Sequence, residues 1–366
     1  MATSVPNYTD YLKLGDLLKL QGGLENNEEG LIPDELLFIV VHQALELWFM
    51  IVNRELRLAR DHLAAPKVPE DTVPNVVHHL RRVNRVLELA VDHFKVMETL
   101  TPQDFLGFRE KITPASGFQS SQMREMEILL GMKSKQRVSY GKVDPIEHLK
   151  KLSKTGPSGM EAWARVQKVQ AEQTFQEALR AWLYRTPING STPSDAGDDT
   201  AVQTFIDAYL VHFDGFMDKQ CKALQKTMPE SGDTSTRFES AKQGARDFLH
   251  ALDVEEDERP RLCRTRAGLL FIESYRDLPL LAWPRLLVDS VVELEELTLI
   301  WRNRHARMVE RMIGRRVGTG GSSGVDYLDK TGKIRIFTDL WAVRTVMMPK
   351  NTLPPLHNKE FYGFAK

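Results

Sequence analysis

Two histidines with aromatic or sulfur-containing neighbours are the first residues in this sequence that could do chemistry. His42 follows Phe38 by four residues, so on a helix the two side chains lie on the same face. His305 shares a helical face with Met308 and Met312. A buried neutral imidazole can hold a metal, including the iron of a haem. It can equally be a core residue bonded to a backbone carbonyl, and spacing alone leaves both interpretations open.

An arginine and a glycine-rich loop could bind the polar end of a ligand. Arg109 lies among aromatic residues in FLGFREKI, where its guanidinium could hold a carboxylate through two hydrogen bonds. An internal salt bridge to a glutamate is the equally open alternative. Residues 318–324 read GTGGSSG, contain Thr319, and lack the lysine and preceding strand of a nucleotide-binding loop. Composition favours a flexible linker, but the loop directly follows an apolar helix, so its small residues could approach a ligand.

The composition excludes several broad classes of protein. The chain has 366 residues and a formal net charge of −1, so no global field favours nucleic acid or an anionic membrane. Cys221 and Cys263 lack metal-ligand spacing and are expected to be free thiols in a reducing compartment. The N-terminus lacks the segments of a signal peptide. Residues 36–52 are apolar but short for a membrane span, so we expect a buried core helix in a soluble, cytoplasmic protein.

The elements that must position these residues are predicted to be helices. Pro33 begins a helix that continues to about residue 64, and Pro284 begins one that ends at Gly314. Pro102 begins a short element. Apolar periodicity predicts further helices at about 75–100, 120–130, 159–184, 200–227, 236–253 and 265–278. Residues 133–157 are interpreted as surface structure and 186–200 as a mobile loop.

No alternating strand pattern and no fixed-period repeat interrupts these helices. We therefore expect an all-α, multi-helix bundle formed by one domain, residues 1–366. Within residues 1–30, Tyr8, Tyr11 and Leu12 share a face if that segment is helical. Such an aromatic arm could pack on its own domain or on a neighbouring subunit.

Several long blocks resemble the signature blocks of the tryptophan 2,3-dioxygenase family. They are FIVVHQALELWF (38–49), ETLTPQDFLGFREKITPASGFQS (98–120), WRNRHARMVERMIG…GTGGSSGV (301–325), and NYTDYLKL near the start. The blocks follow the family order and span nearly the whole chain. The resemblance implies an all-α homotetramer with haem b bound between the helices of each subunit.

The resemblance also implies a role for each matching residue. His305 matches the axial ligand of the haem iron, with Gly320 and Ser116 beside the cofactor. His42 matches the histidine that hydrogen-bonds the indole N–H. The residues implied in substrate binding are Phe38, Phe105, Arg109, Ser116 and Thr319, together with Tyr8, Tyr11 and Leu12 from the arm that reaches a neighbouring active site.

The activity implied is cleavage of the indole C2–C3 bond of L-tryptophan by the co-substrate O2, giving N-formyl-L-kynurenine in the first step of tryptophan catabolism. One alternative is a family relative that inserts a single oxygen atom into tryptophan or a β-methyl tryptophan in secondary metabolism. Another is a haem-binding helical sensor without turnover. No nucleic acid or membrane partner is expected.

Overall fold

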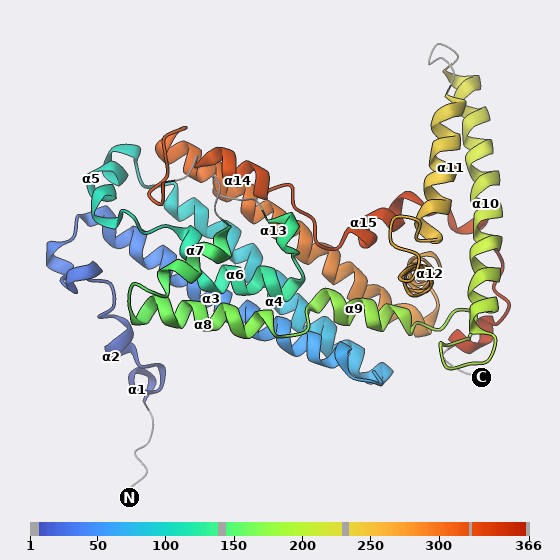
Figure 1. Ribbon diagram of the computed structural model, residues 1–366, viewed down its shortest axis with the longest axis horizontal. Helices are drawn as coiled ribbons and strands as arrows, with labels where there is room; N and C mark the ends of the chain where they lie inside the picture. Colours follow the sequence, from blue (N-terminus) through green and yellow to red (C-terminus); the bar gives the residue numbers. More distant parts are fainter. Residues whose placement is uncertain (1–6, 138–143, 229–233, 322–323, 364–366) are drawn as a thin grey trace, which may run out of the picture. The chain divides into compact units, whose positions relative to one another are not determined.

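The computed structural model describes residues 7–137, 144–228, 234–321 and 324–363, and their regular structure is helical throughout (Figure 1). The only extended pairing among these residues is an isolated bridge between Ile188 and Ser191. The predicted all-α fold is therefore confirmed. Cys221 and Cys263 are free thiols, as predicted.

The described residues form two compact units. The first lies within Met1–Arg54, Val83–Glu172 and Glu296–Ile334, and the second within Glu55–Arg82, Gln173–Glu295 and Arg335–Lys366. Helices of the first unit are α1 (Tyr8–Leu12), α2 (Leu14–Leu17), α5 (Pro102–Ile112), α6 (Ser121–Leu130), α7 (Pro145–Leu152), α8 (Pro157–Gln170) and α14 (Val325–Thr331). Those of the second are α9 (Phe175–Tyr184), α10 (Asp198–Thr227), α11 (Ser235–Leu249), α12 (Arg259–Ser274) and α15 (Thr338–Thr345). Residues of α3 (Pro33–Ala64), α4 (Val73–Met97) and α13 (Ala282–Ile313) occur in both. The single domain 1–366 stays a prediction.

The short helices of the first unit begin at residues that can cap them. Thr101 accepts a hydrogen bond from the backbone N–H of Asp104 at the start of α5. Ser120 does the same for α6, with 3.1 Å between its Oγ and a backbone nitrogen of the first turn. Gly131, at φ 109°, ends α6 in the left-handed conformation that glycine adopts without strain.

Helix α3 buries one apolar face in the core of the first unit. The buried positions are Val41, Leu45, Phe49 and Val52. By length and composition α3 is the one described helix that could cross a membrane, with mean hydropathy 1.8 over a window that is 28% buried. Its polar residues nevertheless bond within the unit. Gln43 donates to the carbonyl of Leu20 (2.8 Å), and Glu46 accepts from Gln122 (3.0 Å). These bonds support its interpretation as a helix of the fold.

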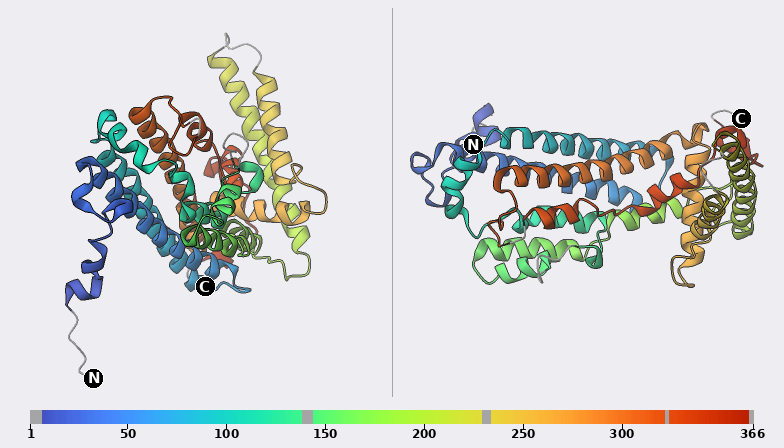
Figure 2. Two further views of the ribbon diagram at one scale, coloured as in Figure 1. Left: turned by 60° about the vertical axis from the view of Figure 1, so that its left-hand side comes forward. Right: turned by 90° about the horizontal axis from the view of Figure 1, so that it is seen from above.

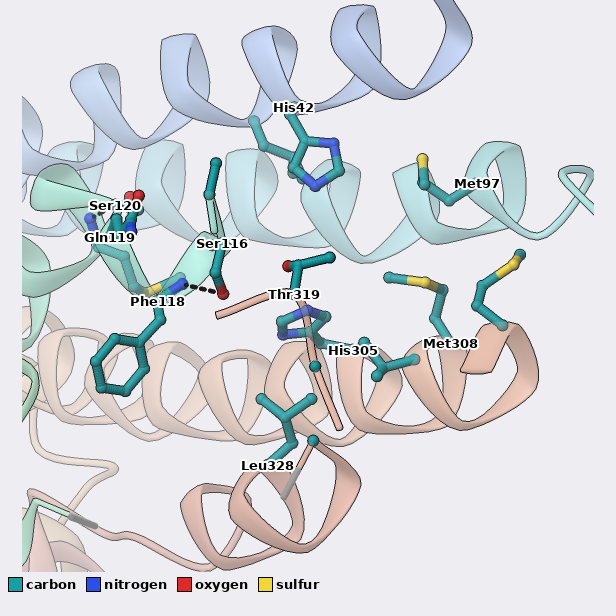
Figure 3. A pocket seen from close by; sticks show the side chains of 18 of the residues that line it. His42, Met97, Ser116, Phe118, Gln119, Ser120, His305, Met308, Thr319 and Leu328 are labelled. Carbon is teal, nitrogen blue, oxygen red and sulfur yellow. Dashed lines mark hydrogen bonds between the residues drawn. The ribbon is translucent and has the colours of Figure 1, made fainter. Parts of the chain in front are cut away.

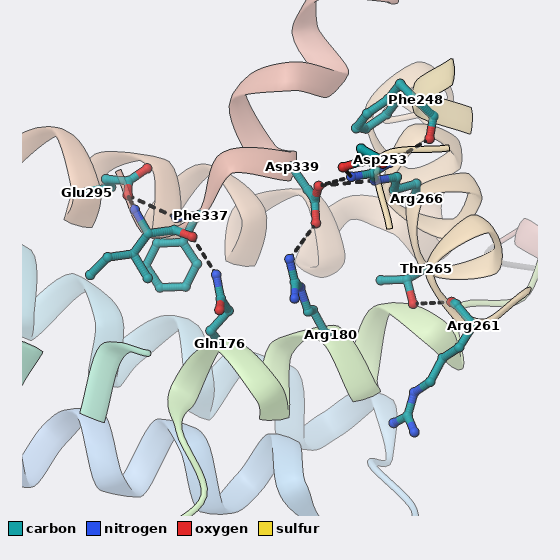
Figure 4. Close-up of polar contacts among 11 residues, drawn as sticks. Gln176, Arg180, Phe248, Asp253, Arg261, Thr265, Arg266, Glu295, Phe337 and Asp339 are labelled. Atoms are coloured by element: carbon teal, nitrogen blue, oxygen red, sulfur yellow. Dashed lines mark hydrogen bonds and ion pairs between the residues drawn. The ribbon is translucent and has the colours of Figure 1, made fainter. Parts of the chain in front are cut away.

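In the second unit, α12 packs against α9, α11 and α15, and a network of charged side chains joins them (Figure 4). Arg266 of α12 donates to Asp253 (2.6 Å) and to Asp339 at the start of α15 (2.9 Å). Arg180 of α9 donates to the other oxygen of Asp339 (3.0 Å). Because Arg266 is buried, these carboxylates offset the cost of removing its charge from water. Helices α10 and α11 run side by side as a pair in both views (Figures 1 and 2).

Two predictions for residues 133–184 are wrong. The single helix expected at 159–184 is two helices, α8 and α9, because Thr174 begins α9 with a capping box that includes Glu177. Residues 133–157 are not all surface, because α7 buries Pro145, Ile146 and Leu149 and packs against α8. The part of that segment at 138–143 lies outside the described residues. The mobility of 186–200 stays a prediction.

Candidate functional site

A mostly apolar cavity of about 470 Å³ lies within the first unit. Its volume falls in the range of small-molecule sites. The walls come from α3, α4, α5, α6, α13 and α14, from η4 (Gly117–Gln119), and from the segment that follows α13. The predicted site residues that line it are Phe38, His42, Phe105, Arg109, Ser116, His305 and Thr319. Residues from distant parts of the sequence thus meet in one cavity.

His42 and His305 project into this cavity from opposite sides, one from α3 and the other from α13 (Figure 3). The Nδ1 atom of His42 lies 2.7 Å from the carbonyl oxygen of Phe38. A carbonyl can only accept, so Nδ1 carries the hydrogen. Burial lowers the pKa of His42, while the Phe38 hydrogen bond and the charge of Glu46 raise it by less. His42 is therefore a neutral imidazole whose Nε2 atom is free to accept a hydrogen bond.

His305 lies in an aromatic environment at the opposite wall. Its ring stacks on Phe94, with centroids 5.7 Å apart and planes 10° apart, and meets Trp301 at 5.2 Å. Burial lowers the pKa of His305 to about 4, with smaller contributions from His42 and from the Arg124 charge. The imidazole is consequently neutral near pH 7, which is the form that ligates a metal.

Arg109 lies in the last turn of α5, with Phe105 and Phe108 buried on the same helix. Among the described residues Arg109 has no carboxylate partner. Its Nη2 instead donates to the carbonyl oxygen of Val317, just ahead of the glycine-rich loop. The internal salt bridge considered from the sequence is thus absent there, and the guanidinium is joined to the loop that carries Thr319.

Two glycines in and before the glycine-rich loop are required by the structure, one by its backbone conformation and one by a close contact. Gly314, at φ 57°, ends α13 in a conformation that favours glycine. A Cβ added at Gly320 would lie 2.9 Å from the Cβ of Ser116, so only glycine fits against η4. The Oγ of Ser116 in turn accepts from the backbone N–H of Phe118 (3.3 Å). Ser322 and Ser323, also part of the predicted loop, lie outside the described residues.

Four predicted site residues do not line the cavity: Tyr8, Tyr11, Leu12 and Gly320. Tyr8, Tyr11 and Leu12 of α1 are 74%, 78% and 43% exposed. Packing of this arm on a neighbouring subunit stays a prediction. Gly320 contacts Ser116 rather than lining the cavity itself.

Sequence reasoning missed a charged group at the cavity wall. Arg124, Glu127 and Arg302 all line it and are largely buried, with side chains 11%, 6% and 5% exposed. Glu127 forms an ion pair with Arg124 (2.8 Å) and accepts a hydrogen bond from Arg302 (3.1 Å). The available signal was the spacing of Arg124 and Glu127, three residues apart among methionines and leucines.

The helices and the cavity define an all-α protein built around a buried small-molecule site with two opposed neutral imidazoles. Residues 1–347 match the family model described as tryptophan 2,3-dioxygenase. Tryptophan 2,3-dioxygenase 2 of Ralstonia nicotianae is 45% identical over 98% of this chain and 98% of its own length. Tryptophan 2,3-dioxygenase of Sorangium cellulosum is 42% identical over 98% of this chain and 87% of its own. A tryptophan 2,3-dioxygenase-like protein of Xanthomonas campestris is 45% identical over 73% of this chain and 98% of its own.

The chain belongs to the tryptophan 2,3-dioxygenase family.

Proposed function

We propose that this protein is a haem-dependent tryptophan 2,3-dioxygenase. It cleaves the indole C2–C3 bond of L-tryptophan with O2 and yields N-formyl-L-kynurenine, the first product of tryptophan catabolism. The observation that carries the proposal is the meeting of His42, His305, Arg109 and Thr319 around one cavity in a chain of this family. Such a set can hold a prosthetic group on one side and an amino acid on the other.

The cavity residues fit haem b. A flat apolar macrocycle needs an apolar slot and one neutral imidazole, and the cavity supplies both, with Phe94, Met97 and Met308 beside His305. His305 is the proposed axial ligand, and Ser116 and Gly320, which approach one another closely, are the proposed neighbours of the cofactor. When bound, haem supplies the binding and activation of O2. The protein's own contribution is to position the substrate and to exclude water.

Arg109 and Thr319 are the proposed contacts for the amino-acid end of the substrate. A guanidinium without a carboxylate partner is suited to a bidentate bond with the α-carboxylate. Because Arg109 already bonds the carbonyl of Val317, carboxylate binding and the position of Thr319 are coupled through one side chain. Phe38 and Phe105, with ring centroids 6.0 Å apart, are the proposed aromatic wall for the indole.

His42 is proposed to orient the indole. Its Nδ1–H is committed to the Phe38 carbonyl, so its Nε2 can accept the indole N–H. This hydrogen bond fixes the rotation of the indole ring in its plane, and orientation of this kind contributes strongly to rate. Burial lowers the pKa of His42, which keeps Nε2 an acceptor at neutral pH.

The proposed assembly is a homotetramer with one haem b in each subunit. The exposed Tyr8, Tyr11 and Leu12 of α1 are proposed to complete a neighbouring subunit's active site, because a large exposed apolar surface is typical of an interface. We propose a soluble protein of the cytoplasm. Its balanced charge and free thiols support that location.

Incubation of the reduced, haem-loaded protein with L-tryptophan under ¹⁸O2, followed by mass spectrometry, tests the activity. The expected product is N-formyl-L-kynurenine that carries two labelled oxygen atoms. A product with one labelled atom would identify a monooxygenase. A haem-bound protein that leaves tryptophan unchanged would contradict the proposed function and favour a sensor.

A further inference from the structure

Helix α5 carries Arg109 but buries few of its own side chains. Its buried residues are Phe105 and Phe108, whose rings meet that of Phe38 on α3 at centroid distances of 6.0 and 5.5 Å. Offset and edge-to-face ring contacts are both favourable, so these contacts alone would let a short helix roll about its own axis. Such a roll would move Arg109 relative to the aromatic wall.

Two polar side chains of α5 flank its aromatic face and contact different parts of the unit. The Nζ of Lys111 donates to Oε2 of Glu35 in the first turn of α3 (3.0 Å), and Arg109 donates to the carbonyl oxygen of Val317. Residues advance by about 100° each around an α-helix, so Lys111 and Arg109 lie on opposite sides of Phe108. The two contacts together fix the roll of α5.

Glu35 is a well-held partner for Lys111. The Glu35 side chain is 7% exposed, and its Oε2 also accepts from the backbone N–H of Ile32 (3.4 Å). Loss of the lysine would therefore leave a mostly buried carboxylate without its cation, which is costly. Glu35, Phe38 and His42 are three and four residues apart, so they share one face of α3. Lys111 thus joins α5 to the helix face that is proposed to hold the indole.

We propose that Lys111 is a positioning residue. Its ion pair with Glu35 sets the separation between the Arg109 guanidinium and the indole wall, and so favours substrates that carry an α-carboxylate. The inference rests on the proposed function, in which Arg109 binds that carboxylate. A carboxylate competes with the Val317 carbonyl for the Arg109 guanidinium, whereas the Lys111–Glu35 pair does not involve the substrate and continues to hold α5.

Calorimetric titration of the haem-loaded protein with three indole compounds tests this role. L-tryptophan and indole-3-propionate carry the carboxylate, and tryptamine lacks it. In Lys111→Met the dissociation constants of the first two should rise about threefold to tenfold, the range expected for one ordinary hydrogen bond. The dissociation constant of tryptamine should stay the same. Glu35→Gln should give the same pattern, and Lys111→Arg, which keeps the charge, should restore most of the affinity.

Lys95→Met is the matched control, because it removes a lysine that pairs with Asp92 on α4 (2.6 Å) and leaves α5 unchanged. It should bind all three compounds as the unaltered chain does. An equal loss for all three compounds in Lys111→Met would overturn the proposal, and so would full affinity in that variant. An unaltered chain that binds L-tryptophan no more tightly than tryptamine would instead contradict the proposed function, in which Arg109 binds the carboxylate.

A double substitution separates an effect through Arg109 from an independent effect on the cavity. Arg109→Ala removes the group that Lys111 is proposed to position. Adding Lys111→Met to Arg109→Ala should therefore weaken L-tryptophan binding no further, since two residues that act as one unit give non-additive losses. Additive losses in the double variant would show that Lys111 acts independently of Arg109 and would overturn the proposal.

Discussion

At the scale of single residues, the decisive property of His305 is that burial keeps its imidazole neutral. Among the described α13 residues that line the cavity, His305 alone carries an imidazole. We expect His305→Ala to lose haem, because the remaining apolar walls supply packing but no iron bond. The visible spectrum of the purified protein measures this, with His78→Ala on α4 as a control outside the cavity. Full haem loading with an unchanged axial spectrum would remove His305 as the ligand.

Arg109 presents a different case, because its proposed role is toward one substrate group only. Arg109→Ala should reduce kcat/KM for L-tryptophan by the equivalent of roughly 2–5 kcal/mol, the usual cost of removing one partner of a buried charge pair. Tryptamine lacks the α-carboxylate, so its binding should change little. Arg85→Ala, at an exposed ion pair, is the control. Equal losses for both compounds would show that Arg109 acts through the fold instead.

At the scale of elements, the contact between η4 and the glycine-rich loop is tight enough to test with one methyl group. In Gly320→Ala the new Cβ would lie 2.9 Å from the Cβ of Ser116, so the loop with Thr319 must shift. We expect kcat/KM to fall about tenfold to a hundredfold, as displacement by an ångström commonly costs. Gly15→Ala, where nothing lies within 4 Å, should have no effect. An unchanged kcat/KM in folded Gly320→Ala would show that this contact does not set the position of Thr319.

Helix α12 carries a buried carboxyl group that should make stability depend on pH. Glu273 is 1% exposed, neither oxygen has a hydrogen bond, and Arg344 and Arg276 lie 3.7 and 3.8 Å away. Burial raises its pKa, so the folded state holds a proton that the unfolded state has released. Stability therefore falls as pH rises through the raised pKa, and the cost is complete above it.

Glu273→Gln should consequently stabilise the protein by roughly 1–3 kcal/mol at pH 7, since an amide does not titrate and removes the free-energy cost that accompanies the raised pKa. The gain should disappear below the ordinary carboxyl pKa of 4.5. Urea unfolding at a series of pH values measures both, with the exposed Glu88→Gln as the control. A gain that does not vary with pH would argue against ionisation of Glu273 as the cause.

The elements themselves were largely predictable from the sequence. Pro33 and Gly314 mark one boundary each of α3 and α13, and the apolar period between boundaries identifies both as helices. The break between α8 and α9 was missed because Thr174 and Glu177 lie inside a continuous apolar period. A capping box depends on only four residues, and the apolar periodicity that continues through both helices predicted one uninterrupted helix.

At the scale of the whole molecule, spacing alone could not predict which residues share the cavity. His42, Arg109 and His305 lie on different helices, and only their family resemblance joined them before the fold was known. Arg124 and Arg302 escaped notice because arginine is usually exposed, and nothing local in the sequence distinguishes a buried ion pair from a surface one. Tertiary packing decides that difference.

If the exposed arm α1 acts in a neighbouring subunit, two inactive variants should complement each other within one oligomer. Tyr8→Ser/Tyr11→Ser should retain haem but lose most activity, because its own cavity residues are intact while its neighbour's active site lacks the arm. His305→Ala has an intact arm but a cavity that cannot hold haem. Co-expression of the two variants should restore activity, since the intact arm of one chain reaches the intact haem site of the other. Light scattering establishes that mixed tetramers form.

Co-expression of His305→Ala with Arg109→Ala supplies the matched control for this complementation. Both of those defects lie in the same cavity of the same unit, and every intact arm would then meet a defective site in one chain or the other. Activity should therefore stay low. If the doubly substituted arm variant is fully active by itself, or if the mixture gains nothing over its separate components, α1 does not act across subunits and each cavity is complete within its own chain.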